Sequence, residues 1–191
     1  MKRLRETNIN TPEYFDEQFF QRIVDKENNL RQEKYIELIG ETRGRIIELG
    51  CGMSYFPKMA EEIGESWGLD FTPKAIRSLR LQFPTVNYVV GNALETPFRD
   101  KYFDTVLSGE LLEHIEEPQK LIDEMVRIAK KQVILSTPKL EFDDLEHLWE
   151  FEEEDLKGML KKYGHVTTET LESNMFPGRS YIFAKCELSI D

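Results

Sequence analysis

The stretch Ile46-Ile47-Glu48-Leu49-Gly50-Cys51-Gly52-Met53-Ser54 decides how this chain folds. Its apolar beginning belongs to a short strand expected over Arg45–Leu49, and a helix is expected from Ser54 to Ile63. The glycines between them allow the backbone to turn sharply and to approach a ligand closely. A strand, a glycine-rich turn and a helix in this order indicate a nucleotide-binding α/β fold.

The alternation of strands and helices continues along the chain. Further strands are expected at 66–70, 86–91, 103–108 and 132–136, with intervening helices at 72–83 and 118–129. Thr72 is the expected N-cap of the first of these helices, with Pro73 at its first position. A helix at 152–163 and two strands, 166–171 and 181–186, complete the pattern. The alternation predicts a mostly parallel sheet with right-handed crossovers, and the short link 172–179 predicts an antiparallel hairpin at one edge.

The N-terminal region is expected to form a helical cap. Residues 13–40 carry apolar side chains at roughly helical spacing, namely Tyr14, Phe15, Phe19, Ile23, Leu30, Tyr35 and Leu38. The whole chain, 1–191, has the length of one domain, so the expectation is a cap over 1–40 and an α/β core over 41–191.

Composition restricts the class of protein and its partners. The formal charge is −11, which disfavours nucleic acid as a partner because an acidic surface repels phosphates. No apolar run is long enough to cross a membrane, and residues 1–6 do not begin a secretory signal. Cys51 and Cys186 show no zinc or disulfide spacing, so two reduced thiols in a cytoplasmic protein are expected.

The glycine-rich turn separates two classes of nucleotide site. A dinucleotide motif needs a third glycine where Tyr55 stands, and the lysine of a P-loop is absent from the sequence. Glu48, Gly50 and Gly52 instead resemble the E/D-x-G-x-G-x-G motif of the class I S-adenosylmethionine-dependent methyltransferases. Ser54 replaces the last glycine of that motif, and this small residue can cap the helix. A tight βα turn without a ligand is the alternative.

This resemblance implies a fold and a cofactor. The fold is a Rossmann-like class I methyltransferase sandwich, in which a seven-stranded, mostly parallel sheet has an antiparallel edge hairpin and helices on both faces. The cofactor is S-adenosyl-L-methionine, which becomes S-adenosyl-L-homocysteine. Glu48, Gly50, Cys51 and Gly52 are then expected to contact it. In such sheets ligands bind beyond the carboxyl ends of the strands.

The second strand ends at an acidic residue. Asp70 follows Glu48 at about the 20-residue separation at which a carboxylate meets a ribose in related nucleotide sites. The family places its ribose-binding acid at this strand end, and Phe71 is a candidate wall for the adenine. The alternative for Asp70 is an interaction with the dipole of the following helix.

Two further segments resemble family motifs. Gly91-Asn92-Ala93-Leu94-Glu95-Thr96-Pro97-Phe98 is similar to the turn that contacts the adenine, with Asn92 in place of the usual aspartate and Ala93 and Leu94 contributing backbone contacts. Asn92 as a simple turn residue is the alternative. The segment 103–115, which contains Phe103-Asp104 and Glu113-His114, resembles the fourth strand of the small-molecule methyltransferases. There Glu110 and Leu111 are expected beside the cofactor.

The remaining candidates concern the reaction itself. His147 is the first general-base candidate and His114 the second, because imidazole titrates near neutral pH. His147 could equally be a structural residue of its loop. Tyr14 is expected to reach the cofactor from the N-terminal helix, with ordinary packing as the alternative.

No metal is expected. Glu110, Glu113, His114 and His147 nevertheless resemble the metal site of small-RNA 2′-O-methyltransferases, which leaves a metal-assisted RNA enzyme as an alternative function. The main expectation is a soluble methyltransferase that acts on an oxygen, nitrogen or carbon nucleophile of a small-molecule acceptor. A non-catalytic S-adenosylmethionine-binding module is the other alternative. The acceptor and the oligomeric state are left open by the sequence.

Overall fold

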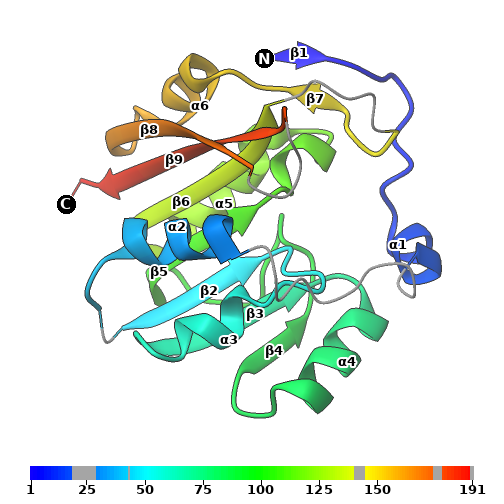
Figure 1. Ribbon diagram of the computed structural model, residues 1–191, viewed down its shortest axis with the longest axis vertical. Helices are drawn as coiled ribbons and strands as arrows, with labels where there is room; N and C mark the ends of the chain where they lie inside the picture. The colour runs from blue at the N-terminus through cyan, green and yellow to red at the C-terminus, as the bar shows by residue number, and fades with distance from the viewer. Residues whose placement is uncertain (19–28, 43, 140–144, 174–177, 190–191) are drawn as a thin grey trace.

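The computed structural model describes residues 1–18, 29–42, 44–139, 145–173 and 178–189. Its centre is a seven-stranded sheet with the order β4-β3-β2-β5-β6-β9-β8 (Figure 1). The strands are β2 (Arg45–Leu49), β3 (Glu65–Asp70), β4 (Asn87–Val90), β5 (Phe103–Gly109), β6 (Ala129–Lys139), β8 (Gly164–Glu172) and β9 (Ser180–Leu188). β2 to β6 pair in parallel, whereas β9 is antiparallel to both β6 and β8. The predicted fold class and its antiparallel edge hairpin are therefore confirmed.

Helices cover both faces of this sheet because neighbouring strand residues point to opposite sides. Ile46 packs with α2 (Asn29–Ile39) and α3 (Phe56–Ala60) on one face. Ile47 packs with α5 (Pro118–Ile128) and α6 (Glu153–Leu160) on the other. Figure 1 shows α2 and α3 in front of the sheet and α5 behind it. Helix α4 (Pro73–Gln82) packs beside β4.

Several predicted boundaries were wrong by a few residues. Helix α3 is shorter than the predicted 54–63, because Glu62 and Ile63 each donate to a carbonyl three residues back, as in isolated turns. Strand β6 begins at Ala129 rather than 132, because Ala129 already pairs with Phe103. Thr72 is the N-cap of α4, but its side chain makes no capping hydrogen bond.

The N-terminal region contains elements that the helical pattern missed. Strand β1 (Lys2–Arg3) pairs antiparallel with β7 (Trp149–Glu150), and the Arg3 guanidinium lies 5.1 Å from the centre of the Trp149 ring. Helix α1 (Pro12–Gln18) begins one residue before the predicted helix 13–40, and α2 lies within that range. The predicted helical residues Phe19 and Ile23 lie outside the described residues. Among the described helices, none has the length and apolar character needed to cross a membrane.

Candidate active site

A cavity of about 460 Å³ lies beyond the carboxyl ends of β2, β3, β4 and β5. Its volume falls in the usual range for a small-molecule site. Nine of the predicted cofactor residues line it, namely Gly50, Gly52, Asp70, Phe71, Asn92, Ala93, Leu94, Glu110 and Leu111. The parallel sheet thus brings the strand-end motifs together, as its topology requires.

The glycine turn is held against the neighbouring strand by its backbone. The amides of Gly50 and Cys51 both donate to the carbonyl of Leu69, at 2.8 and 3.0 Å. Gly50 has φ +72°, and a Cβ built on it would lie 2.7 Å from Cδ2 of Leu111. Gly52 has φ +46° and no atom within 4 Å of a built Cβ, so its side faces open space. Both positions need glycine for their backbone conformation.

Asp70 links this turn to the next helix. Its Oδ2 accepts from the Gly52 amide and its Oδ1 from the Thr72 amide, each at 2.8 Å. Asp70 also lines the cavity, and a carboxylate is the kind of acceptor that a ribose diol requires. The buried Asp70 carboxylate is therefore oriented in advance by two backbone donors.

Glu48 and Cys51 do not line the cavity. Glu48 is buried beneath the turn, and its Oε2 atom has no hydrogen-bond partner among the described residues. Desolvation by burial raises the pKa of Glu48 to about 8, although a hydrogen bond with Ser54 opposes this. The Cys51 side chain packs in a buried cluster with Ile76 and Tyr88. Burial raises the pKa of its thiol.

The raised pKa of Glu48 predicts a pH-dependent stability. The folded state holds a proton that the unfolded chain releases near pH 4.3, so the free energy of unfolding should fall as pH rises from about 5 to 8. The loss should be on the order of a few kcal/mol. Denaturant unfolding across this pH range should show the slope in the native chain and lose most of it in Glu48→Gln. The exposed Glu62→Gln is the matched control, and an unchanged slope in Glu48→Gln would contradict the assignment.

The polar side chains that follow β4 and β5 have different hydrogen-bond and ion-pair partners. The side-chain Oδ1 of Asn92 accepts from the Leu94 amide at 2.9 Å, which favours the turn-residue interpretation and occupies the Leu94 donor. Glu110 has φ +52°, an uncommon conformation for a residue with a side chain, and its amide donates to Ser136. Its carboxylate forms an ion pair with Arg31 of α2. Leu111 packs over Gly50.

The N-terminal segment closes one side of the cavity. Phe15 lines it and lies 5.7 Å from Phe71, measured between ring centroids. The predicted Tyr14 is not among the lining residues, because its hydroxyl donates to the Glu146 carboxylate at 3.1 Å. Asn10 also lines the cavity, and its side-chain amide donates to the carbonyls of His114 and Glu146. No sequence pattern pointed to Asn10, since this residue precedes the first helix and belongs to no periodic pattern.

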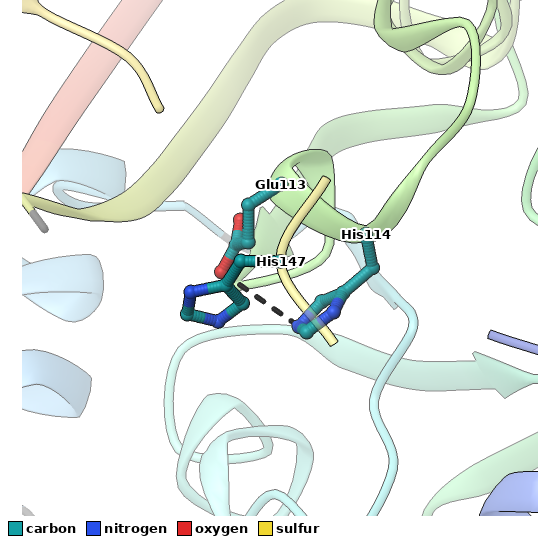
Figure 2. A group of neighbouring side chains, drawn as sticks. All are labelled: Glu113, His114 and His147. Atoms are coloured by element: carbon teal, nitrogen blue, oxygen red, sulfur yellow. Dashed lines mark ion pairs between the residues drawn. The ribbon is translucent and has the colours of Figure 1, made fainter. Parts of the chain in front are cut away.

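The two predicted base candidates meet at the same end of the cavity. His114 ends the short 3-10 helix η2 (Leu112–His114) and lines the cavity. His147 is not among the lining residues, but its ring lies 4.9 Å from that of His114, between centroids. Glu113 lies beside both rings (Figure 2).

The charges that line the cavity favour one kind of nucleoside-containing cofactor over another. The carboxylates that line it belong to Asp70, Glu110 and Glu116, while much of the remaining lining is apolar. Acidic walls repel phosphate groups and favour a cation. S-adenosylmethionine has a sulfonium, an ammonium and a ribose diol, so this acidic lining fits that cofactor better than it fits a dinucleotide.

Known proteins share this domain. Residues 47–137 match the family described as Methyltransferase domain. Norajmaline N-methyltransferase from Rauvolfia serpentina is 30% identical over 44% of this chain and 32% of its own length. Demethylmenaquinone methyltransferase from Lysinibacillus sphaericus is 28% identical over 75% of this chain and 68% of its own length. The chain thus spans about a third of the first relative and about two thirds of the second.

A solved structure shares the fold. Phosphoethanolamine N-methyltransferase 2 from Haemonchus contortus, in complex with S-adenosyl-L-methionine, has a TM-score of 0.75 and 15% identity. The match covers 93% of this chain and 58% of that chain. The chain is therefore similar in sequence to known methyltransferases, with residues 47–137 matching their domain, and it shares the fold of a solved methyltransferase.

Proposed function

We propose that the chain transfers the methyl group of S-adenosylmethionine to a small-molecule acceptor bound in the described cavity. The observation that carries this proposal is the cavity itself: its volume of about 460 Å³, its acidic and apolar lining, and its place at the strand ends. The formal charge of −11 supports a small acceptor over a nucleic acid. The relatives named above act on an alkaloid and a quinone precursor, so the family accepts different small molecules.

In this proposal the cofactor lies along the ends of β2 to β5. Asp70 accepts from the ribose hydroxyls at the cavity wall, and the open side of Gly52 admits the methionine part. Phe71 packs on the adenine, while Ala93 and Leu94 border it. The cofactor supplies an activated methyl group, so the chain's own task is to align the acceptor and to exclude water.

The acceptor is proposed to bind near His114 and Glu110, away from the glycine turn. The N-terminal segment 1–40 acts as the cap of a single domain, in which Phe15 excludes water from the cavity. His114 is the better-placed proton acceptor because it lines the cavity, and His147 stands behind it as its partner. Glu48 is proposed to support the glycine turn from below, since its side chain is buried and does not line the cavity.

Calorimetry with S-adenosylmethionine tests the proposal most directly. We expect one site per chain with a dissociation constant between about 1 μM and 1 mM, the usual range for enzyme substrates. Methyl transfer from labelled cofactor should then be measured with quinols, phenols, amines and an RNA mixture. An absence of cofactor binding at millimolar concentration would refute the proposal, and transfer confined to RNA would refute a small-molecule acceptor.

A further inference from the structure

Three side chains of metal-binding type converge at the His114 end of the cavity. Glu113 and His114 come from η2, and His147 comes from the segment that leads into β7. Their candidate ligand atoms all lie within 4.8 Å of one another, and Nε2 of His114 lies 3.9 Å from Oε1 of Glu113 (Figure 2). Ligand atoms bound to one ion at about 2.1 Å lie roughly 3–3.5 Å apart, so a small inward movement completes the geometry.

Hydrogen bonds to neighbouring groups orient two of these side chains. Nδ1 of His114 lies 3.0 Å from the carbonyl oxygen of Glu146, which can only accept, so Nδ1 carries the proton. In neutral imidazole the lone pair is then on Nε2, which is the atom nearest Glu113. The Thr137 hydroxyl donates to Oε2 of Glu113 at 3.2 Å. Metal-binding histidines and carboxylates are usually oriented in this way.

The backbone holds the two segments together. The Leu148 amide donates to the carbonyl of Glu113 at 2.8 Å, and Nε1 of Trp149 donates to the carbonyl of Ile115 at 2.9 Å. His147 is therefore fixed beside η2 although it is distant in the sequence. A rigid backbone of this kind is what a metal site requires, because ligand positions must be kept within fractions of an ångström.

Burial and charge favour an ion at this position. Glu113 has an exposed fraction of 0%, and buried carboxylates are normally paired or bound to a metal. Glu110, the fourth candidate in the sequence, forms its ion pair with Arg31 and is not part of the group. Two imidazoles and one carboxylate suit zinc and the neighbouring first-row metals, whereas magnesium and calcium prefer oxygen ligands alone.

We propose that Glu113, His114 and His147 bind one divalent transition-metal ion whose open coordination positions face the cavity through His114. This metal site extends the proposed function, and only the catalytic role of the metal rests on that function. It departs from the metal-free site expected from the sequence. The metal holds the oxygen of a hydroxyl acceptor and lowers its pKa. His114, as a metal ligand, then no longer serves as the proton acceptor described above, so the hydroxyl proton passes to water and the oxygen bonds to the methyl carbon. The electron pair of the broken C–S bond stays on sulfur, which leaves neutral S-adenosylhomocysteine.

Cobalt and zinc binding to the full chain tests the site without any acceptor. After treatment with a chelator and its removal, Co²⁺ should bind at one equivalent and give visible ligand-field absorption, and Zn²⁺ should displace it. His147→Ala and Glu113→Gln should each weaken Co²⁺ binding at least 100-fold. His165→Ala is the matched control, because this third histidine lies in β8 outside the group, and it should bind Co²⁺ as the native chain does.

Each outcome decides the proposal. Absence of Co²⁺ absorption in the native chain, or equal binding in a folded His147→Ala variant, would show a hydrogen-bonded Glu-His-His group without a metal. The folding of each variant is checked by its thermal unfolding, and His147→Ala remains informative if Glu113→Gln fails to fold. Calorimetry with S-adenosylmethionine on the metal-free chain separates the two proposals. Cofactor binding without Co²⁺ binding refutes only the metal site, whereas loss of cofactor binding refutes the proposed function.

Discussion

Replacing Asp70 with alanine is expected to weaken S-adenosylmethionine binding by roughly 10- to 150-fold, or about 1.5–3 kcal/mol. The carboxylate accepts from Gly52 and Thr72, so it is already fixed at the cavity wall, where it is proposed to accept from the ribose hydroxyls. Charge-assisted hydrogen bonds of this kind are the stronger ones. The substitution also releases two backbone amides of the cavity wall. Calorimetry should therefore show a higher dissociation constant with little change in stoichiometry.

Asp104→Ala provides the matched control for this experiment. Asp104 also accepts from a backbone amide, that of Arg45 at 3.0 Å, but it lies near the start of the central strand β5, at the end away from the cavity. Its removal should lower the free energy of unfolding without changing the dissociation constant. If Asp70→Ala bound the cofactor as tightly as Asp104→Ala does, the ribose contact proposed for Asp70 would be wrong.

Gly50→Ala is the second substitution with a large expected effect, a loss of cofactor affinity of about 10- to 100-fold. A side chain at φ +72° costs about 1 kcal/mol, and the new Cβ would lie 2.7 Å from Leu111. The turn and Leu111 must both move, and both line the cavity. The measurement is the dissociation constant by calorimetry, together with the temperature of unfolding.

Gly40→Ala separates backbone strain from damage to the cavity. Gly40 follows α2, has the same φ of +72°, and has no atom within 4 Å of a built Cβ. This variant should therefore lose a similar amount of stability from strain while it retains cofactor affinity. Equal affinity in the two variants would mean that the position of the glycine turn is unimportant for binding.

The elements that the sequence predicted well are those with local patterns. The strands β2, β3 and β5 are short apolar runs next to a turn residue, and their bounds were predicted to within one residue. Proline at the start of α4 and α5 marked both helices. Strand β1 was missed because two residues carry no periodicity, and it is held by its pairing with the distant β7.

The side chains of the site likewise separate into those that a local sequence pattern predicted and those that only the tertiary structure placed. The sequence placed Asp70 at a strand end, and the cavity contains it, because residues that end parallel strands meet at one edge of the sheet. The sequence could not select Phe15 over Tyr14, since these rings are neighbours on one helix and only the structure shows that Phe15 lines the cavity while Tyr14 donates to Glu146. It placed Glu48 at the cofactor, whereas the side chain is buried below the turn.

The sequence alone therefore determined the order of the strands and helices, the glycine turn and the acid that follows it. These features depend on neighbouring residues and on the connectivity of parallel strands. Only the tertiary structure decided that His147 meets Glu113 and His114, and that the N-terminal segment closes the cavity. Those contacts join residues far apart in the chain, and they follow from the hydrogen bonds of Leu148, Trp149 and Asn10 rather than from any local pattern.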